Sequence, residues 1–211
     1  MNKIKKFKIR PHLKDITRRV YKSGADLRGV NLADETALNK FILDFAKNLK
    51  PGVIYNFFEG ETAALEEAGV THRDMFSVCM VTLGKEIETA MEAVKDNPAV
   101  STIYAVAFAD FLRTAVGFTA DLIKEQAEKE EFETENFEVL FSPVFSYGPE
   151  PKFLREAVKV SSEIALKILP VLMKELDARK IDVTLSETGG LEPKGAIIFL
   201  VPWDKKKRRK K

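Results

Sequence analysis

The sequence has 211 residues, a formal net charge of +2 and 45% hydrophobic residues. A chain of this length buries about 70% of its unfolded surface when it folds, so it needs no metal ion or disulfide for stability. The single cysteine, Cys79, excludes an intramolecular disulfide and a cysteine-based zinc site. Its apolar neighbours predict an inert core thiol, and its isolation favours a reducing compartment.

The positive charge is concentrated at the C-terminus. Residues 205–211 carry seven positive charges and no negative one, which leaves the rest of the chain with a net charge of −5. Such a stretch can bind nucleic-acid phosphates electrostatically, but it is more often a disordered, solubilising extension, and the acidic body offers no matching basic face. We therefore expect one domain over residues 1–204, a basic tail over residues 205–211 and no nucleic-acid partner.

Two other classes of protein are disfavoured by the sequence. No apolar run approaches 18 residues without polar interruption, and the N-terminal lysines are not followed by the apolar core of a signal peptide. We expect a cytoplasmic protein with no membrane partner. His12 and His72 lie far apart without a nearby carboxylate pattern, so the sequence predicts no metal site.

The first third of the chain mixes strands and helices. Residues 4–9 predict a short edge strand that ends before Pro11, and residues 13–21 predict a helix. Asp34 is placed to cap a second helix, whose apolar positions recur on one face until Pro51. Residues 53–58 then read as a strand, closed by Gly60.

The apolar run over residues 76–83 predicts a strand buried on both faces. A helix should begin after Gly84. A strand that passes through a glycine into a helix N-terminus can offer backbone N–H groups to an anion, so Thr82, Leu83 and Gly84 form a candidate ligand edge. One glycine is nevertheless not a phosphate-binding loop.

A long helix is predicted over residues 99–129. Apolar residues cover nearly the whole circumference of its first half, so it should be the central buried helix. Asp110 and Arg113 lie three residues apart on this apolar segment. Because an unpaired charge is costly inside a protein, we expect them to pair with each other or to point into a cleft.

The last third of the chain ends in a segment that could form a ligand-binding site. A strand is expected over residues 137–141, a loop rich in turn formers and rings over residues 142–149, and a helical region over residues 154–176 that Pro170 kinks or splits. Residues 181–184 are β-branched, the next residues are polar with two glycines, and an apolar run follows Pro193. We interpret this as a strand, a loop and a returning strand, with the loop either a ligand site or a solvated turn.

Three segments together resemble a known family. They read V-T-L-G-K-E-I-E at residues 81–88, S-P-V-F-S-Y-G at residues 142–148, and K-I-D-V-T-L-S-E-T at residues 180–188 with Pro193 beyond. In this order they resemble the activation domain of cobalamin-dependent methionine synthase, and more closely the stand-alone proteins similar to that domain. The matching segments lie between about residues 78 and 199.

The resemblance implies a fold and a function. The fold is a single C-shaped α+β domain in which a long buried helix packs on a mixed or antiparallel sheet. The domain binds S-adenosylmethionine and docks on a corrinoid-binding methyltransferase, which carries the cobalamin. Together with a flavodoxin-type electron donor, it supports reductive remethylation of cob(II)alamin. The resemblance assigns the domain itself no catalytic residue.

The resemblance also implies where the ligand binds. Two loops supply the expected contacts with S-adenosylmethionine, and Tyr147 and Glu187 provide the ring and the carboxylate that suit a sulfonium cation. The expected ligand-binding residues are Ser146, Tyr147, Gly148, Ser186, Glu187 and Thr188.

The sequence departs from the family at the first of these loops. Leu140 and Phe141 occupy the neighbourhood of the family's ligand-binding arginine. The family's Gly-Tyr pair is either replaced by Val144 and Phe145 or displaced to residues 146–148. The alternative function is therefore a non-catalytic module that interacts with a corrinoid protein and has lost S-adenosylmethionine binding.

Overall fold

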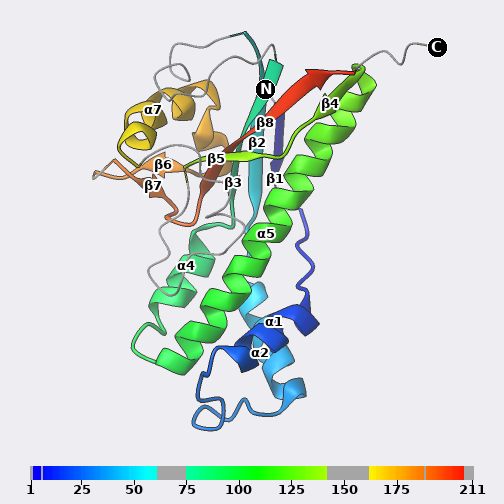
Figure 1. Ribbon diagram of the computed structural model, residues 1–211. Coiled ribbons are helices and arrows are strands. Elements are labelled where there is room, and N and C mark those ends of the chain that lie inside the picture. The colour runs from blue at the N-terminus through cyan, green and yellow to red at the C-terminus, as the bar shows by residue number, and fades with distance from the viewer. Residues whose placement is uncertain (1, 6, 61–74, 142–161, 188, 207–211) are drawn as a thin grey trace, which may run out of the picture.

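The computed structural model describes residues 2–5, 7–60, 75–141, 162–187 and 189–206 (Figure 1). They form an α+β architecture, as expected. The strands are β1 (Asn2–Lys5), β2 (Gly52–Glu59), β3 (Met75–Thr82), β4 (Phe132–Thr134), β5 (Glu138–Phe141), β6 (Thr184–Leu185), β7 (Leu191–Glu192) and β8 (Ile197–Lys205). The helices are α1 (Leu13–Lys22), α2 (Glu35–Ala46), α4 (Lys85–Glu92), α5 (Pro98–Lys129), α7 (Ser162–Glu175) and the 3-10 helix η1 (Ala178–Ile181).

The main sheet is antiparallel and has the strand order β1-β2-β3-β8-β4. One edge of β8 pairs with β3, and its other edge pairs first with β5 and then with β4. The short strand β1 lies at the opposite edge. The sequence predicts a short edge strand near the N-terminus, but over residues 4–9, and the structure places it at Asn2–Lys5. Lys205 pairs with Phe132, so β8 extends one residue beyond the expected domain boundary at residue 204. Residues 207–211 of the expected tail lie outside the described residues.

The two faces of the sheet bury two separate cores. Cys79 and Val81 of β3, with Phe199 of β8, contact the core that includes α1, α2 and α5. Their neighbours Met80 and Ile198 contact the second core, which includes α7 and η1. Successive side chains of a strand point to opposite faces, so a continuous apolar run satisfies both cores. The prediction of a strand buried on both faces is confirmed.

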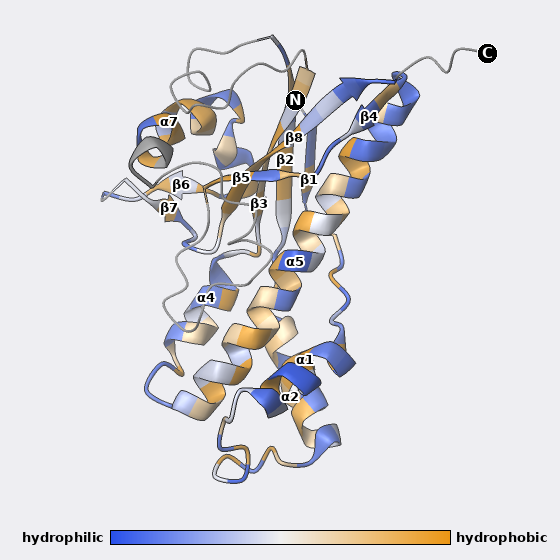
Figure 2. Ribbon diagram, viewed as in Figure 1, coloured by the Kyte–Doolittle hydropathy of each residue, from blue (hydrophilic) through white to orange (hydrophobic). Residues whose placement is uncertain are grey.

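Helix α5 is the long buried helix that the sequence predicts, and it runs along most of the length of the molecule (Figures 1 and 2). Asn97 caps it by accepting a hydrogen bond from the backbone N–H of Val100 at 3.2 Å, and Pro98 starts its first turn. By length and composition alone α5 could cross a membrane, but half of its most apolar stretch is buried inside the protein. A core helix has the same properties.

Asp110 is fully buried on α5 and is paired. Its carboxylate accepts a hydrogen bond from Arg113 at 2.9 Å, and it lies 3.2 Å from Nδ1 of His12 and 3.3 Å from the backbone N of His12. The expected pairing of Asp110 with Arg113 is therefore present, and the same carboxylate holds the start of α1 against α5. His72 lies outside the described residues.

The elements around α5 follow their sequence signals with two differences. Asp34 caps α2 by accepting from the backbone N–H of Ala37 at 2.8 Å, as predicted. Helix α7 continues through Pro170 instead of splitting there. Strand β4 was not predicted, because its residues follow a charged helix end and only three of them pair with β8.

The prediction that the strand over residues 181–184 pairs with the strand after Pro193 is wrong. The segment at residues 178–181 forms the 3-10 helix η1, flanked by Asp177 and Asp182 with φ of 48° and 60°. Aspartate tolerates this left-handed conformation, which breaks the expected strand. The strand that does follow, β6, pairs with β7 in a separate two-stranded sheet. The run after Pro193 enters the main sheet as β8.

A buried hydrogen bond joins two central strands and can be tested directly. Nε1 of Trp203 donates to Oγ of Ser77 at 2.9 Å, and both residues are buried. Replacement of Ser77 by alanine leaves the indole N–H without its acceptor and should lower the free energy of unfolding by about 2 kcal/mol. In a Trp203→Phe background the same replacement should cost less than half as much, measured by urea denaturation. Equal costs in both backgrounds would show that the hydrogen bond contributes nothing.

Candidate functional site

The β6–β7 hairpin carries the predicted acidic loop. Thr184 pairs with Glu192, and the backbone N–H of Ser186 donates to the carbonyl of Gly190 at 2.8 Å. Oγ of Ser186 accepts from the backbone N–H of Gly190 at 3.0 Å, and Gly189 has a φ of +83°. The hairpin tip is therefore closed by its own hydrogen bonds, and a glycine supplies the left-handed turn residue.

The structure describes two of the six predicted ligand contacts. Ser186 is half-buried and Glu187 is exposed, both at the hairpin tip. The other four predicted contacts, in both loops, lie outside the described residues: Ser146, Tyr147, Gly148 and Thr188. Ser186 and Glu187 lie near the described pocket, on the same hairpin, but do not line it.

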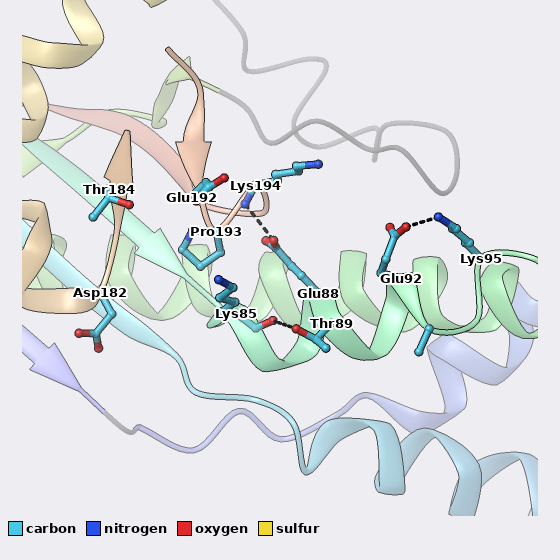
Figure 3. A pocket seen from close by; sticks show the side chains of 11 residues that line it. Lys85, Glu88, Thr89, Glu92, Lys95, Asp182, Thr184, Glu192, Pro193 and Lys194 are labelled. Atoms are coloured by element: carbon cyan, nitrogen blue, oxygen red, sulfur yellow. Dashed lines mark hydrogen bonds and ion pairs between the residues drawn. The ribbon is translucent and has the colours of Figure 1, made fainter. Parts of the chain in front are cut away.

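A pocket of about 700 Å³ lies between α4 and the base of this hairpin (Figure 3). Its size falls in the range of small-molecule binding sites. One wall is a single face of α4, at spacings of three and four residues, continued by the turn that follows the helix. The other wall is the hairpin base with the residues that flank it. The lining residues are Lys85, Glu88, Thr89, Glu92, Ala93, Lys95, Asp182, Thr184, Glu192, Pro193 and Lys194.

Glu88 joins the two walls. Its Oε2 accepts a hydrogen bond from the backbone N–H of Lys194 at 3.0 Å, and its Oε1 accepts from the backbone N–H of Gly195 at 2.5 Å. Burial raises the pKa of Glu88, and these two N–H groups only partly offset that effect. Both carboxylate oxygens are thus occupied by the protein backbone.

The turn approaches α5 so closely that position 195 requires glycine. A Cβ atom there would lie 2.4 Å from Cζ of Phe108 and 3.0 Å from Oε1 of Glu88. The absence of a side chain lets the backbone N–H of Gly195 reach the Glu88 carboxylate. The turn is therefore fixed between α4 and α5.

Some of the other charged residues of the pocket form ion pairs with described residues, and others do not. Lys95 pairs with Glu92 at 2.5 Å, and Lys5 of β1 pairs with Asp182 at 2.8 Å. The side-chain carboxylate of Glu192 forms no hydrogen bond or ion pair with any of the described residues. Four acidic and three basic side chains line the pocket, so its lining has an acidic surplus.

The backbone N–H of Gly84, before the start of α4, is not available to an anion. The backbone N–H of Gly84 donates to Oγ1 of Thr82 at 3.0 Å, so this N–H is already paired. Gly84 has a φ of +93°, and a Cβ atom there would meet Lys50 at 2.9 Å. Gly84 therefore allows the start of α4 to pack closely against the backbone at Lys50. Cys79 is fully buried and its pKa is raised by burial, as expected of an inert thiol.

Comparisons with known proteins bear on the fold. No protein-family model matches the sequence, and no curated protein sequence matches it significantly. Among solved structures, the crystal structure of the MetH reactivation domain bound to AdoHcy matches with a TM-score of 0.53 and 11% identity. The match covers 100% of this chain and 81% of that one. The chain has the fold of the MetH reactivation domain. The reactivation-domain fold that the sequence motifs suggested is thus confirmed, whereas an identity this low says nothing about ligands.

The reactivation-domain fold places two of the resemblance motifs in contact. Glu88 ends the first motif, and Pro193 with Lys194 ends the third, so the Glu88 hydrogen bonds connect segments 106 residues apart. The sequence shows both motifs, but it does not identify Glu88 or Glu192 as residues that line a pocket. The only signal was that the two motifs occur together, because their spacing in the sequence does not reveal which carboxylate of the first motif contacts the backbone of the third.

The close approach at Gly195 predicts a position-specific sensitivity to a methyl group. Gly195→Ala forces Phe108 or the turn to move, so it should lower the free energy of unfolding by roughly 1–3 kcal/mol. Gly190→Ala in the same hairpin is the matched control, because its Cβ would meet only Oγ of Ser186 at an ordinary 3.6 Å. Urea denaturation of both variants measures the difference. Equal destabilisation would contradict the described packing of the turn.

Proposed function

We propose that this protein is a cytoplasmic accessory protein that binds S-adenosylmethionine and docks on a corrinoid-binding methyltransferase. It supports the repair of cobalamin that has been oxidised to cob(II)alamin. One electron from a flavodoxin-type donor reduces cob(II)alamin to cob(I)alamin. The cobalt then takes the methyl group of S-adenosylmethionine, which gives methylcobalamin and S-adenosylhomocysteine.

The observation that carries this proposal is the fold match over the whole chain. The matching reactivation domain was solved with AdoHcy, which is the demethylated form of S-adenosylmethionine. Two of the three motifs that led from the sequence to this family meet at the Glu88 hydrogen bonds, beside a pocket large enough for a ligand of this size.

The charges of the pocket suit a zwitterionic ligand. A sulfonium cation is favoured near carboxylates, and the lining has an acidic surplus. The ligand's own carboxylate needs a cation, and Lys85 and Lys194 line the same pocket. Their ammonium groups attract the carboxylate as point charges, whereas the family uses the fork of an arginine. We propose that Ser146, Tyr147, Gly148, Ser186, Glu187 and Thr188 contribute further contacts from the two loops.

In this proposal the protein positions its partners and the cofactors carry out the redox chemistry. The electron comes from the donor protein, the cobalt from the corrinoid protein, and the methyl group from S-adenosylmethionine. None of these steps needs a nucleophile or an acid–base pair from this chain.

One observation favours the alternative, an interaction module that has lost the ligand. Leu140 and Phe141 occupy the neighbourhood of the family's ligand-binding arginine, and the side chain of Leu140 is buried in the second core, 1% exposed. A guanidinium at position 140 would be costly there. On this alternative the fold is kept for docking on a corrinoid protein alone.

Calorimetric titration with S-adenosylmethionine separates the two functions. The proposed function predicts heat that saturates at micromolar ligand, and the alternative predicts none up to millimolar ligand. Glu187→Gln and Tyr147→Ala should each weaken binding by about 1–3 kcal/mol, because each removes a polar or ring contact. Glu59→Gln, in an exposed residue at the end of β2, serves as the control. Unchanged affinity in both loop variants would show that the loops do not contact the ligand.

A further inference from the structure

The pocket contains four carboxylates, but the protein already engages three of them. Glu88 accepts two backbone N–H groups, Glu92 pairs with Lys95, and Asp182 pairs with Lys5. A carboxylate that is already paired gains less from a further cation, since the partner has offset part of its charge. Glu192 differs from them, because none of the described residues forms a hydrogen bond or ion pair with its side-chain carboxylate.

Glu192 lies at a fixed place in the pocket wall. It ends β7, where it pairs with Thr184 of β6, and it directly precedes Pro193. The next two backbone N–H groups, those of Lys194 and Gly195, are the ones that Glu88 accepts. The side chain of Glu192 is exposed and lines the pocket. Figure 3 shows Glu88 reaching from α4 to the turn that carries Glu192.

The carboxylates of Glu88 and Glu192 also interact electrostatically. The pKa of Glu88 is raised mainly by burial, and the negative charge of Glu192 raises it further. Lys194 acts in the opposite sense but does not cancel the shift. A cation held beside Glu192 would relieve this repulsion, so this part of the pocket favours a positively charged ligand.

We propose that Glu192 is the carboxylate that recognises the positive charge of the ligand, and that Glu88 is the positioning residue that holds Glu192 in place. This assignment rests on the proposed function, because it takes the sulfonium of S-adenosylmethionine as the charge. Glu88 does not contact the ligand. It acts through the turn at residues 193–195.

The assignment makes Glu192 responsible for selecting the methylated ligand. S-adenosylmethionine and S-adenosylhomocysteine share every group except the methyl that makes the sulfur cationic. A carboxylate at the sulfur binds the cation more tightly than the neutral thioether, because only the cation gains charge–charge attraction. The protein should then prefer its substrate to its product, which helps the product leave after methyl transfer.

Titration of the full chain with both compounds tests the assignment. Wild-type protein should bind S-adenosylmethionine more tightly than S-adenosylhomocysteine. Glu192→Gln should reduce that preference about tenfold and leave S-adenosylhomocysteine affinity unchanged, as expected when one charge-assisted contact is lost. Glu88→Gln should instead weaken both compounds by a similar factor, because a glutamine side chain offers one acceptor to two N–H groups. Glu86→Gln, whose carboxylate pairs with Lys50 outside the pocket, should change neither affinity.

An amide-exchange measurement examines the positioning role without any ligand. The backbone amides of Lys194 and Gly195 should exchange slowly in the wild type and in Glu86→Gln, and at least one should exchange about tenfold faster in Glu88→Gln. Unchanged exchange in Glu88→Gln overturns the role of Glu88. A Glu192→Gln variant that keeps the full preference overturns the role of Glu192 and leaves the proposed function standing. Wild-type protein that binds neither compound contradicts the proposed function, and the assignment of Glu192 with it.

Discussion

The structure around the pocket depends on one carboxylate that serves two backbone N–H groups. Glu88 reaches from α4 to Lys194 and Gly195 at 3.0 and 2.5 Å, and no side chain at position 195 separates the turn from Phe108 of α5. A half-buried carboxylate is stable only where hydrogen bonds replace its lost hydration. The same two hydrogen bonds that satisfy Glu88 therefore hold the two walls of the pocket, α4 and the turn at residues 193–195, at a fixed separation.

The sheet determines where that turn can lie. Strand β8 begins two residues after Gly195 and pairs with β3 on one edge and with β5 and β4 on the other. It fills both cores with alternate side chains, such as Phe199 on one face and Leu200 on the other, so it cannot slide by one residue without reversing its faces. The rigid start of β8 holds the end of the turn, while α4, which leaves the neighbouring strand β3, supplies Glu88. Two adjacent strands thus deliver both walls to one end of the sheet.

Much of this fold was predictable from the sequence, and the reasons are local. Asp34 and Asn97 both precede strong helical patterns and cap α2 and α5 as their residue types suggest. The run over residues 76–83 was expected to be buried on both faces, because it leaves no polar side to expose. The strand expected over residues 181–184 failed since Asp177 and Asp182 adopt left-handed conformations that β-branched periodicity does not reveal. The pocket was harder still. Motif order indicated the family, but it does not reveal that both oxygens of Glu88 accept backbone hydrogen bonds or that Glu192 lines the same pocket.

The central claim is that a sulfonium ligand occupies the space between α4 and the base of the hairpin. Mapping of backbone amide chemical shifts during titration with S-adenosylmethionine tests it most directly. The account predicts that the largest changes fall on residues 85–95, on Thr184 and on residues 192–195, with α1 and α2 unaffected. Changes confined to α1 and α2, or no change at saturating ligand, would contradict it.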